Sequence, residues 1–290
     1  MKVLISTDSS CLIKEDTFKK CNISVFPLNV LIDGVEYLDG VSINQTQLAD
    51  AMLDNKSIKT STPPLGVVIE YFEKLFSLGY DKIIHFTISS KLSSMYELFL
   101  NVSKNHFANR ICVIDSYSVS AVMLSEVLYA YDCLEKGGCI EDIYRYLEKR
   151  KKDNKIYFIP ENLTALKNGG RISPTVAAIA NKIGLKPVIM LKDGSLEKVG
   201  MTTNVVKVLI EKIKVLSKSF PVDDYDYTLI EFEGKTSIVE KIIDKAKKVL
   251  EIDDIIHSIL PINICAHCGP GTIGIIISPK INNKSILEFI

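Results

Sequence analysis

The amino-acid sequence predicts a two-domain α/β fold, with a parallel sheet and crossover helices in the first domain and a mixed sheet with helices in the second. Three runs rich in β-branched residues each end in a polar turn and are followed by a helical pattern; they are Lys2–Ser6, Lys82–Thr87 and Arg110–Ile114. Strand, polar turn and helix in repeated order are typical of a parallel sheet. A chain of 290 residues, 47% of them hydrophobic, is long enough for two such domains.

The first domain is expected to span residues 1–153. Its helices are predicted at Leu65–Leu78, Ser94–Asn105, Ser120–Lys136 and Ile140–Lys152. Residues 25–40 interrupt the pattern with two short strand patterns around Asp33-Gly34, a favourable hairpin turn, so we expect a small β insert there. The last helix ends in a strongly basic run, which is most simply a solvated helix end that leads into a linker.

The second domain is expected at residues 154–290. Its strands are predicted at Ile156–Ile159, Lys186–Lys192, Tyr227–Phe232 and Ile273–Ser278, with one more at either Ile256–Leu260 or Ile262–Ala266. Its helices are predicted near Leu163–Lys167 and at Pro174–Ile183, Val205–Ser217 and Lys235–Leu250. The last two helices show apolar residues at helical spacing.

Composition excludes several classes of function. The 35 basic and 35 acidic residues give a formal net charge of +0, which offers no bulk attraction to nucleic acid or to an anionic membrane. No stretch approaches the roughly 18 apolar residues that cross a bilayer, and the first residues lack the features of a secretory signal. The seven cysteines are odd in number and scattered, which argues against a disulfide framework. We therefore expect a soluble cytoplasmic protein that binds no nucleic acid and does not insert stably into membranes.

Two clusters of hydroxyl residues precede predicted helices. The first is Thr60-Ser61-Thr62-Pro63-Pro64, and the second runs from Ser89 to Ser94 after a strand, where open α/β sheets bind ligands. Such residues cap helices, and for the first cluster this interpretation is favoured. The same hydroxyls, with free backbone N–H groups, also suit an anion, and for the second cluster the two interpretations are equally balanced.

Paired glycines precede Arg171 in the segment Gly169–Ser173. The glycines are typical of a helix C-cap. The arginine suits either an anion clamp or a bridge between the two domains, with the bridge slightly favoured.

The segment His267–Gly271 is expected at the end of an apolar strand. Its continuation to Gly274 matches G-x-G-x-x-G, but a strand pattern follows where a dinucleotide site needs a helix, so no nucleotide site is predicted. Cys265 and Cys268 flank the histidine without the second Cys/His pair that a zinc site needs. A serine hydrolase using Ser93 and His267 is conceivable, although G-x-S-x-G is absent.

Taken together, these segments resemble the DegV family, and within it the fatty-acid-binding subunits of bacterial fatty acid kinases. The resemblance extends over nearly the whole chain, in order, through Thr7–Ser10, Pro27-Leu28, Tyr37–Gly40, Thr60-Ser61 with Pro63, Ser89–Ser93 with Tyr96, Asp115-Ser116, Gly169–Ser173, Lys186-Pro187, and His267 with Gly269–Gly271. It implies two α/β domains with a lipid held between them, no cofactor, and no catalytic residue in this chain.

The resemblance also implies roles for particular residues. Ser61, with Thr60 beside it, and Ser93, with Ser94 beside it, match hydroxyls that bind the carboxylate of a long-chain fatty acid. His267 matches a histidine near that headgroup, and Arg171 matches the arginine of a glycine-glycine-arginine motif. The implied partner is an ATP-binding kinase subunit that phosphorylates the bound carboxylate.

The sequence departs from the family pattern at three places. Thr62-Pro63-Pro64 stands where relatives usually carry Gln-Pro-Ser, and Ser94-Met95 stands where they carry glycine and threonine. The stretch Lys198–Thr203 has no arginine, although relatives usually have one there. Two alternatives therefore stay open beside the fatty acid carrier: a hydrolase or acyl transferase using Ser93 and His267, and a carrier of another amphipathic anion.

Overall fold

A parallel four-stranded sheet forms the first half of the protein, in a computed structural model that describes residues 1–12, 15–150, 152–161, 163–172 and 184–289. Its strands lie in the order β2-β1-β6-β7. They are β1 (Val3–Asp8), β2 (Ile23–Phe26), β6 (Lys82–Thr87) and β7 (Ile111–Asp115). The chain runs from β1 to β2 on one side and continues to β6 and β7 on the other, so the strand order reverses between β1 and β6.

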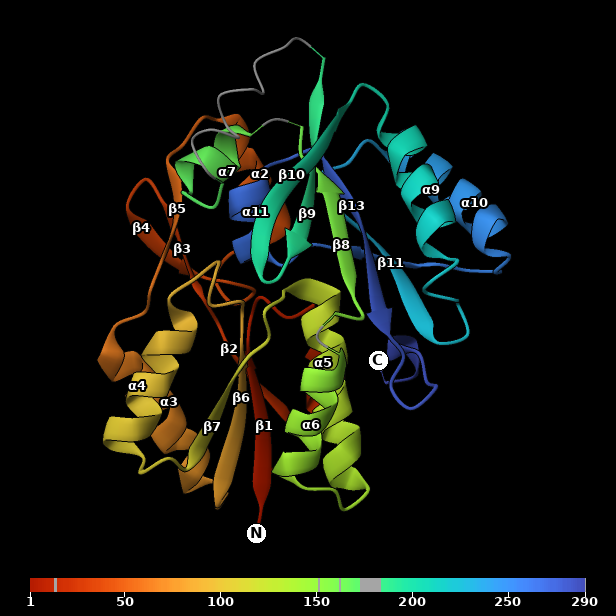
Figure 1. Cartoon of the computed structure of the whole chain (residues 1–290). Helices are drawn as coiled ribbons and strands as arrows, with labels where there is room; N and C mark the ends of the chain where they lie inside the picture. The colour runs from red at the N-terminus through yellow and green to blue at the C-terminus, as the bar shows by residue number, and fades with distance from the viewer. Residues whose placement is uncertain (13–14, 151, 162, 173–183, 290) are drawn as a thin grey trace.

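Helices cover both faces of this sheet (Figure 1). They are α1 (Glu15–Lys20), α3 (Leu65–Ser77), α4 (Met95–His106), α5 (Ser120–Glu135) and α6 (Ile140–Arg150). In the figure α3 and α4 lie on one face and α5 and α6 on the other. The predicted parallel sheet with crossover helices is therefore confirmed.

A separate three-stranded antiparallel sheet lies above the parallel sheet in Figure 1, and the predicted insert at residues 25–40 contributes two of its strands. It consists of β3 (Asn29–Ile32), β4 (Val35–Leu38) and β5 (Ile58–Ser61), with α2 (Gln45–Leu53) between the last two strands. The predicted hairpin turn is present, since both Asp33 (φ 50) and Gly34 (φ 83) adopt the positive φ that such a turn requires. Strand β5 has no counterpart among the strands predicted from the sequence.

The second half of the chain forms a mixed six-stranded sheet in the order β10-β9-β8-β13-β11-β12. Its strands are β8 (Lys155–Ile159), β9 (Lys186–Lys192), β10 (Ser195–Thr202), β11 (Tyr225–Phe232), β12 (Ile256–Ile259) and β13 (Thr272–Pro279). Only β11 and β12 pair in parallel. The predicted mixed sheet is confirmed, and the predicted helix Pro174–Ile183 falls within residues 173–183, outside the described residues.

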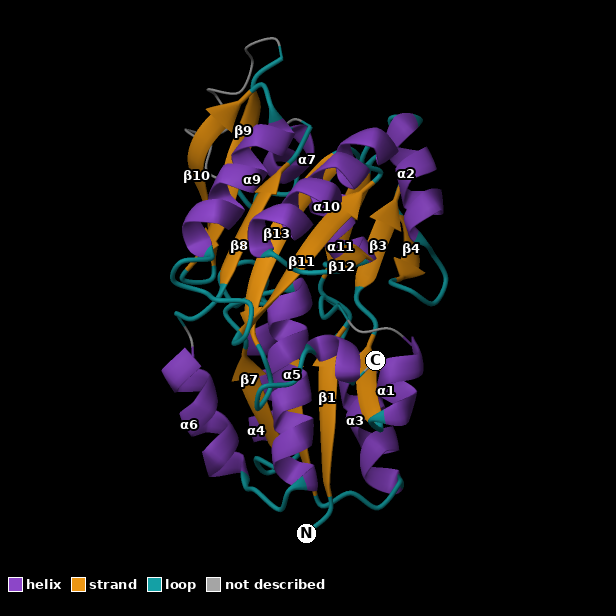
Figure 2. Ribbon diagram, turned by 90° about the vertical axis from the view of Figure 1, so that its right-hand side faces the viewer, coloured by secondary structure: helices purple, strands orange, loops and turns teal. Residues whose placement is uncertain are grey.

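Helices of the second half lie on opposite faces of the mixed sheet. Figure 2 shows α9 (Val205–Leu216) and α10 (Thr236–Leu250) covering one face. The other face looks toward α7 (Thr164–Asn168) and α11 (Ile262–Cys268), and a short 3-10 helix, η1 (Ile286–Glu288), follows the last strand. The predicted domain boundary at residue 153 falls in the connection between α6 and β8, and the division into domains at that point stays a prediction.

The expectation that His267 ends a strand is wrong, because Ile262–Cys268 is helical. Of the two alternatives for the extra strand, the first is correct, since β12 covers Ile256–Ile259. A short apolar run does not reveal its periodicity, but the buried residues of α11 include Ile262, Cys265 and Ala266, which have helical spacing. His267 therefore lies in the last turn of a helix.

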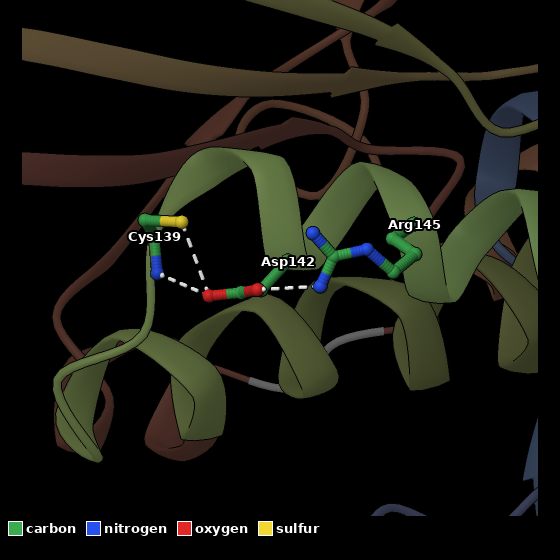
Figure 3. Close-up of polar contacts among 3 residues, drawn as sticks. All are labelled: Cys139, Asp142 and Arg145. Atoms are coloured by element: carbon green, nitrogen blue, oxygen red, sulfur yellow. Dashed lines mark hydrogen bonds and ion pairs between the residues drawn. The ribbon is translucent and has the colours of Figure 1, made fainter.

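The start of α6 is held by a group of exposed polar contacts (Figure 3). The Asp142 carboxylate accepts hydrogen bonds from the backbone N–H and the Sγ of Cys139, both at 3.1 Å, and from Arg145 at 3.0 Å. The hydrogen bond that the Cys139 thiol donates to Asp142 raises the pKa of that thiol. The predicted basic helix end is also present, because Lys149 and Arg150 lie in the last turn of α6.

The buried apolar side chains form two clusters, one on each face of the six-stranded sheet. Tyr157, Leu229 and Ile275 pack with α9 and α10. Ile156 and Phe158, on the opposite face, join the core of the parallel sheet, the three-stranded sheet and α11. Side chains alternate between the faces of a strand, so the same strands line both clusters. No helix within the described ranges is long and apolar enough to cross a bilayer.

Candidate functional site

A pocket of about 120 Å³ lies where the three sheets and α11 meet. Most of its wall is apolar, formed by Leu28, Ile88, Leu92, Met95, Val119, Ile156, Phe158, Leu166, Leu191, Leu196, Ile230, Leu260, Ile264 and Ile276. Its polar lining residues are Asn29, Thr60, Ser61, Thr62, Ser93, Ser94, Ser120, Arg171, Asn263 and His267. Apart from neutral His267, Arg171 is the one ionisable group among these polar residues.

The parallel sheet positions one side of the pocket. Its strand order reverses between β1 and β6, and open α/β sheets bind ligands at the carboxyl ends of strands at such a point. The loop after β6 supplies Ile88, Leu92, Ser93 and Ser94 to the wall. The predicted location at the carboxyl ends of strands is thus where the pocket occurs.

The polar turn after β1 shapes this edge of the sheet and does not line the pocket. The buried Asp8 carboxylate accepts hydrogen bonds from the backbone N–H groups of Ser10 at 2.9 Å and Ile88 at 2.7 Å, and so ties the loops after β1 and β6 together. Burial raises the pKa of Asp8 to about 6. Asp115 acts similarly after β7, since it accepts from the backbone N–H groups of Ser90 and Tyr117.

All six residues predicted from the sequence line the pocket: Thr60, Ser61, Ser93, Ser94, Arg171 and His267. One hydrogen bond joins two of these six residues, and a second joins Ser94 to Thr62 of the first hydroxyl cluster. The Thr60 hydroxyl lies 2.9 Å from Nε2 of His267, and the Ser94 hydroxyl lies 3.0 Å from that of Thr62. Residues more than two hundred positions apart in the chain therefore form one polar rim.

His267 is a neutral imidazole at pH 7. Burial, with the nearby charge of Arg171 adding to it, lowers the pKa of His267 to about 4. Its Nδ1 is buried and has no partner within the described part of the chain. A buried N–H without an acceptor is rarer than a bare lone pair, so the tautomer with the proton on Nε2 is favoured. In that tautomer His267 donates to Thr60, which leaves the Thr60 hydroxyl proton free.

The glycine pair has two different structural roles. Gly170 adopts φ +70, a conformation that suits glycine after a helix. Gly169 has ordinary helical dihedrals but leaves room for His267, because a Cβ on it would lie 2.2 Å from Nδ1. The sequence predicts the cap, but it contains no signal for the close approach of the imidazole.

Arg171 makes two hydrogen bonds to backbone carbonyl groups at the pocket wall. Its Nε donates to the carbonyl oxygen of Leu92 at 3.0 Å, and a terminal nitrogen donates to the carbonyl oxygen of Gly169. Burial lowers the pKa of Arg171, but a guanidinium stays charged in proteins. The same side chain thus connects the loop after β6 to the loop after α7 and places a positive charge at the rim.

The geometry does not assemble a hydrolase triad. Nε2 of His267 is paired with Thr60 and not with Ser93, and no carboxylate in the described ranges holds Nδ1, as a triad requires. Likewise, a search of the described residues finds no group of three or more His, Cys, Asp or Glu side chains that could hold a metal ion. Cys265 and Cys268 are buried free thiols on α11.

Several rim residues have no clear signal in the sequence. Thr62 belongs to the hydroxyl cluster, but its bond to Ser94 follows only from the fold. Asn29 is buried on β3 and donates to Glu36 at 2.5 Å. Ser120 and Asn263 are also buried in the wall, the second bonded to Ser10 at 2.9 Å. A single amide or hydroxyl within a strand or helix gives no local pattern.

The chain is similar to curated proteins over almost its whole length. The chain is similar to a DegV domain-containing protein of Staphylococcus aureus (strain N315), with 29% identity over 285 residues that cover 96% of this chain and 99% of the relative. It is also similar to one of Clostridium acetobutylicum, with 26% identity over 280 residues that cover 96% and 99%.

Solved structures show the same fold. A stearic acid-binding protein of Eubacterium ventriosum superimposes with a TM-score of 0.85 at 25% identity, over 97% of this chain and 99% of that one. A DegV lipid-binding protein of Thermotoga maritima superimposes with a TM-score of 0.82 at 26% identity, over 96% and 99%. The family model described as "Uncharacterised protein, DegV family" matches residues 2–280, so the chain belongs to the DegV family.

Proposed function

We propose that this chain binds one long-chain fatty acid, with the acyl chain against the apolar wall and the carboxylate at the polar rim. The observation that carries the proposal is the composition of the pocket. Its wall is apolar over fourteen side chains, and its rim offers hydroxyl groups and one guanidinium. One of the similar solved structures is a stearic acid-binding protein, and stearic acid is a long-chain fatty acid.

The apolar wall supplies the affinity. A chain of about sixteen carbons, fully buried at roughly 0.8 kcal/mol per methylene, contributes on the order of 12 kcal/mol before ordering costs. Ile156, Phe158 and Ile276 present a continuous face of the six-stranded sheet to it. Because the acyl chain supplies the binding free energy, the polar rim mainly has to orient the headgroup.

The polar rim orients the carboxylate. Within the described part of the chain the Ser93 hydroxyl makes no hydrogen bond, so its proton is available to a ligand. The Thr60 proton is also available, because in the favoured tautomer His267 donates to the Thr60 oxygen. His267 therefore acts on the ligand through Thr60. Arg171 adds a positive charge and, among the described residues, has N–H groups beyond the two that donate to Leu92 and Gly169. These donors suit an anion with two oxygens better than a neutral lipid.

The protein presents this ligand and does not transform it. His267 is committed to Thr60, and Ser93 has no base beside it in the described structure. We propose further that a separate ATP-binding kinase subunit phosphorylates the exposed carboxylate in the cytoplasm. Gly200 and Met201, in β10, lie in the stretch where relatives usually carry an arginine, so a kinase contact that uses an arginine there is not open to this chain.

Native mass spectrometry of the purified protein tests the lipid. We expect one bound fatty acid of fourteen to eighteen carbons, either copurified or taken up from oleate or palmitate. A protein that stays empty after incubation with both acids would overturn the proposal. If the extract contained a different amphipathic anion, the proposed ligand would change and the proposed binding pocket would stand.

Ser93→Ala tests the headgroup contact. Loss of one hydroxyl donor to a charged acceptor weakens palmitate binding by about 1–3 kcal/mol, measured by titration calorimetry. Ser90→Ala is the matched control, since Ser90 lies on the same loop but does not line the pocket. Equal affinity of Ser93→Ala and the wild type would remove Ser93 from the site.

A further inference from the structure

A carboxylate of the protein itself accepts a hydrogen bond from one of the rim hydroxyls. Glu36 on β4 accepts hydrogen bonds from Ser61 Oγ at 3.3 Å and from Asn29 Nδ2 at 2.5 Å. Both donors line the pocket, whereas Glu36 is exposed and lies beside it. The arrangement thus resembles a carboxylate bound by two rim residues.

The strand register explains why these three side chains meet. Asn29 is paired with Ser61 of β5, and Leu31, two residues further along β3, is paired with Glu36 of β4. Side chains two apart on a strand point to the same face, and paired residues share a face. Asn29, Ser61 and Glu36 therefore lie on one face of the three-stranded sheet, and the opposite face carries Thr60 toward His267.

Ser61 has one proton to give. A hydroxyl is a single donor, so while Ser61 donates to Glu36 it offers a second carboxylate only lone pairs. A fatty acid carboxylate also offers only lone pairs. Asn29 differs, because its amide has two N–H groups and keeps one for Glu36 in either case. The Ser61 proton is thus the one for which the two carboxylates compete.

We propose that Glu36 determines the headgroup specificity of the pocket: its carboxylate accepts a hydrogen bond from the Ser61 hydroxyl, and a fatty acid carboxylate must displace it. This inference rests on the proposed function. The charge of Glu36 also opposes an anionic headgroup within hydrogen-bonding reach of the same hydroxyl, and it does not oppose a neutral one. Glu36 is therefore a specificity-determining residue, and it weakens binding of anionic lipids relative to neutral ones.

Glu36→Gln tests this with a charged and an uncharged ligand that share the same acyl chain. We expect palmitate to bind about fivefold more tightly to Glu36→Gln than to the wild type at low salt. The reason is that the variant has no charge at residue 36 to repel the ligand carboxylate. The gain should shrink at ~1 M NaCl, where screening is strong. Methyl palmitate, which has no charge, should bind both proteins equally. Both affinities are measured by titration calorimetry from cyclodextrin-delivered lipid.

Two further variants make the result specific. Glu240→Gln removes one exposed negative charge from α10, on the far face of the six-stranded sheet, and should leave palmitate affinity unchanged. In a Ser61→Ala background the gain from Glu36→Gln should fall below twofold, because the ligand carboxylate is no longer held by Ser61 beside Glu36, where the repulsion acts. A gain that is undiminished in Ser61→Ala would overturn the role of Ser61.

The outcomes separate this inference from the proposed function. Equal palmitate affinity of the wild type and Glu36→Gln would overturn the role of Glu36 and leave fatty acid binding intact. Equal tightening of palmitate and methyl palmitate would also overturn it, because charge would not be involved. A wild type that binds neither lipid would overturn the proposed function itself.

Discussion

Gly169→Ala should displace the buried histidine of the rim without touching the ligand directly. A Cβ at this position would lie 2.2 Å from Nδ1 and 2.9 Å from Cε1 of His267. Ordinary contact begins near 3.4 Å, so the imidazole has to retreat by at least about 1.2 Å. The Thr60–His267 distance of 2.9 Å leaves no room for such a shift before the hydrogen bond is lost.

The loss of a buried hydrogen bond of this kind corresponds to about 1–3 kcal/mol. If the Thr60 proton orients the ligand carboxylate, palmitate affinity should fall by about fivefold to 150-fold in Gly169→Ala. Titration calorimetry measures the affinity, and thermal unfolding reports the change in stability separately.

Gly170→Ala is the matched control one residue away. Gly170 has φ +70 and nothing within 4 Å of a Cβ, so alanine there is strained by about 1–2 kcal/mol and meets no neighbour. It should lower the melting temperature and leave palmitate affinity unchanged. In a His267→Ala background, Gly169→Ala should have no further effect on affinity. Equal loss of affinity in both glycine variants, or wild-type affinity in Gly169→Ala, would refute the reasoning.

Two other predictions concern ionisable groups. Burial raises the pKa of Asp39 from 3.8 to about 6, so the ionised form opposes folding, and its contribution to stability is lost as the pH rises from 3.8 through 6. Asp39→Asn should therefore gain about 3 kcal/mol relative to the wild type between about pH 3.5 and pH 8 in urea unfolding; a gain independent of pH would contradict this. Asp142→Asn should lower the pKa of the Cys139 thiol and speed its alkylation by iodoacetamide at about pH 8 a few-fold, read by mass spectrometry, with buried Cys268 as the internal control. An unchanged alkylation rate would show that the bond in Figure 3 does not govern this thiol.

Strands with strong local signals were predictable. The β-branched runs around Ile83 and Val113 in the parallel sheet, and the run around Ile276 in the mixed sheet, are largely buried and are recognisable as strands without help from tertiary contacts. The hairpin at Asp33-Gly34 is equally local, since its turn requires residues that tolerate positive φ.

Elements whose signal comes from tertiary contacts were not predictable. The β5 segment contains Lys59 and hydroxyl residues, and it becomes a strand because β3 offers it a register. The apolar segment of α11 is too short to show its period, so its helical state follows from Pro261 before it and from the surfaces on which it packs.

The candidate site divides in the same way. The hydroxyl clusters and His267 stand out in the sequence because polar residues gather where strands and helices begin or end. The apolar wall does not, since Ile156 and Phe158 are indistinguishable in sequence from Tyr157 on the opposite face. Glu36 and Asn29 become relevant only once the register of the three-stranded sheet brings them to Ser61.

The contact between the three-stranded sheet and α11 has a consequence for protein synthesis. Thr60 and His267 are separated by 207 residues, and Asn263 also bonds to Asp39, 224 residues away. At about 5–20 residues per second, the ribosome needs on the order of 10–40 seconds to make the intervening chain. Throughout that time the face of β3 and β5 that α11 will cover is exposed in the nascent chain. The three-stranded sheet therefore acquires its full set of contacts only after α11 has been synthesised, which makes its completion a late step in the maturation of the protein.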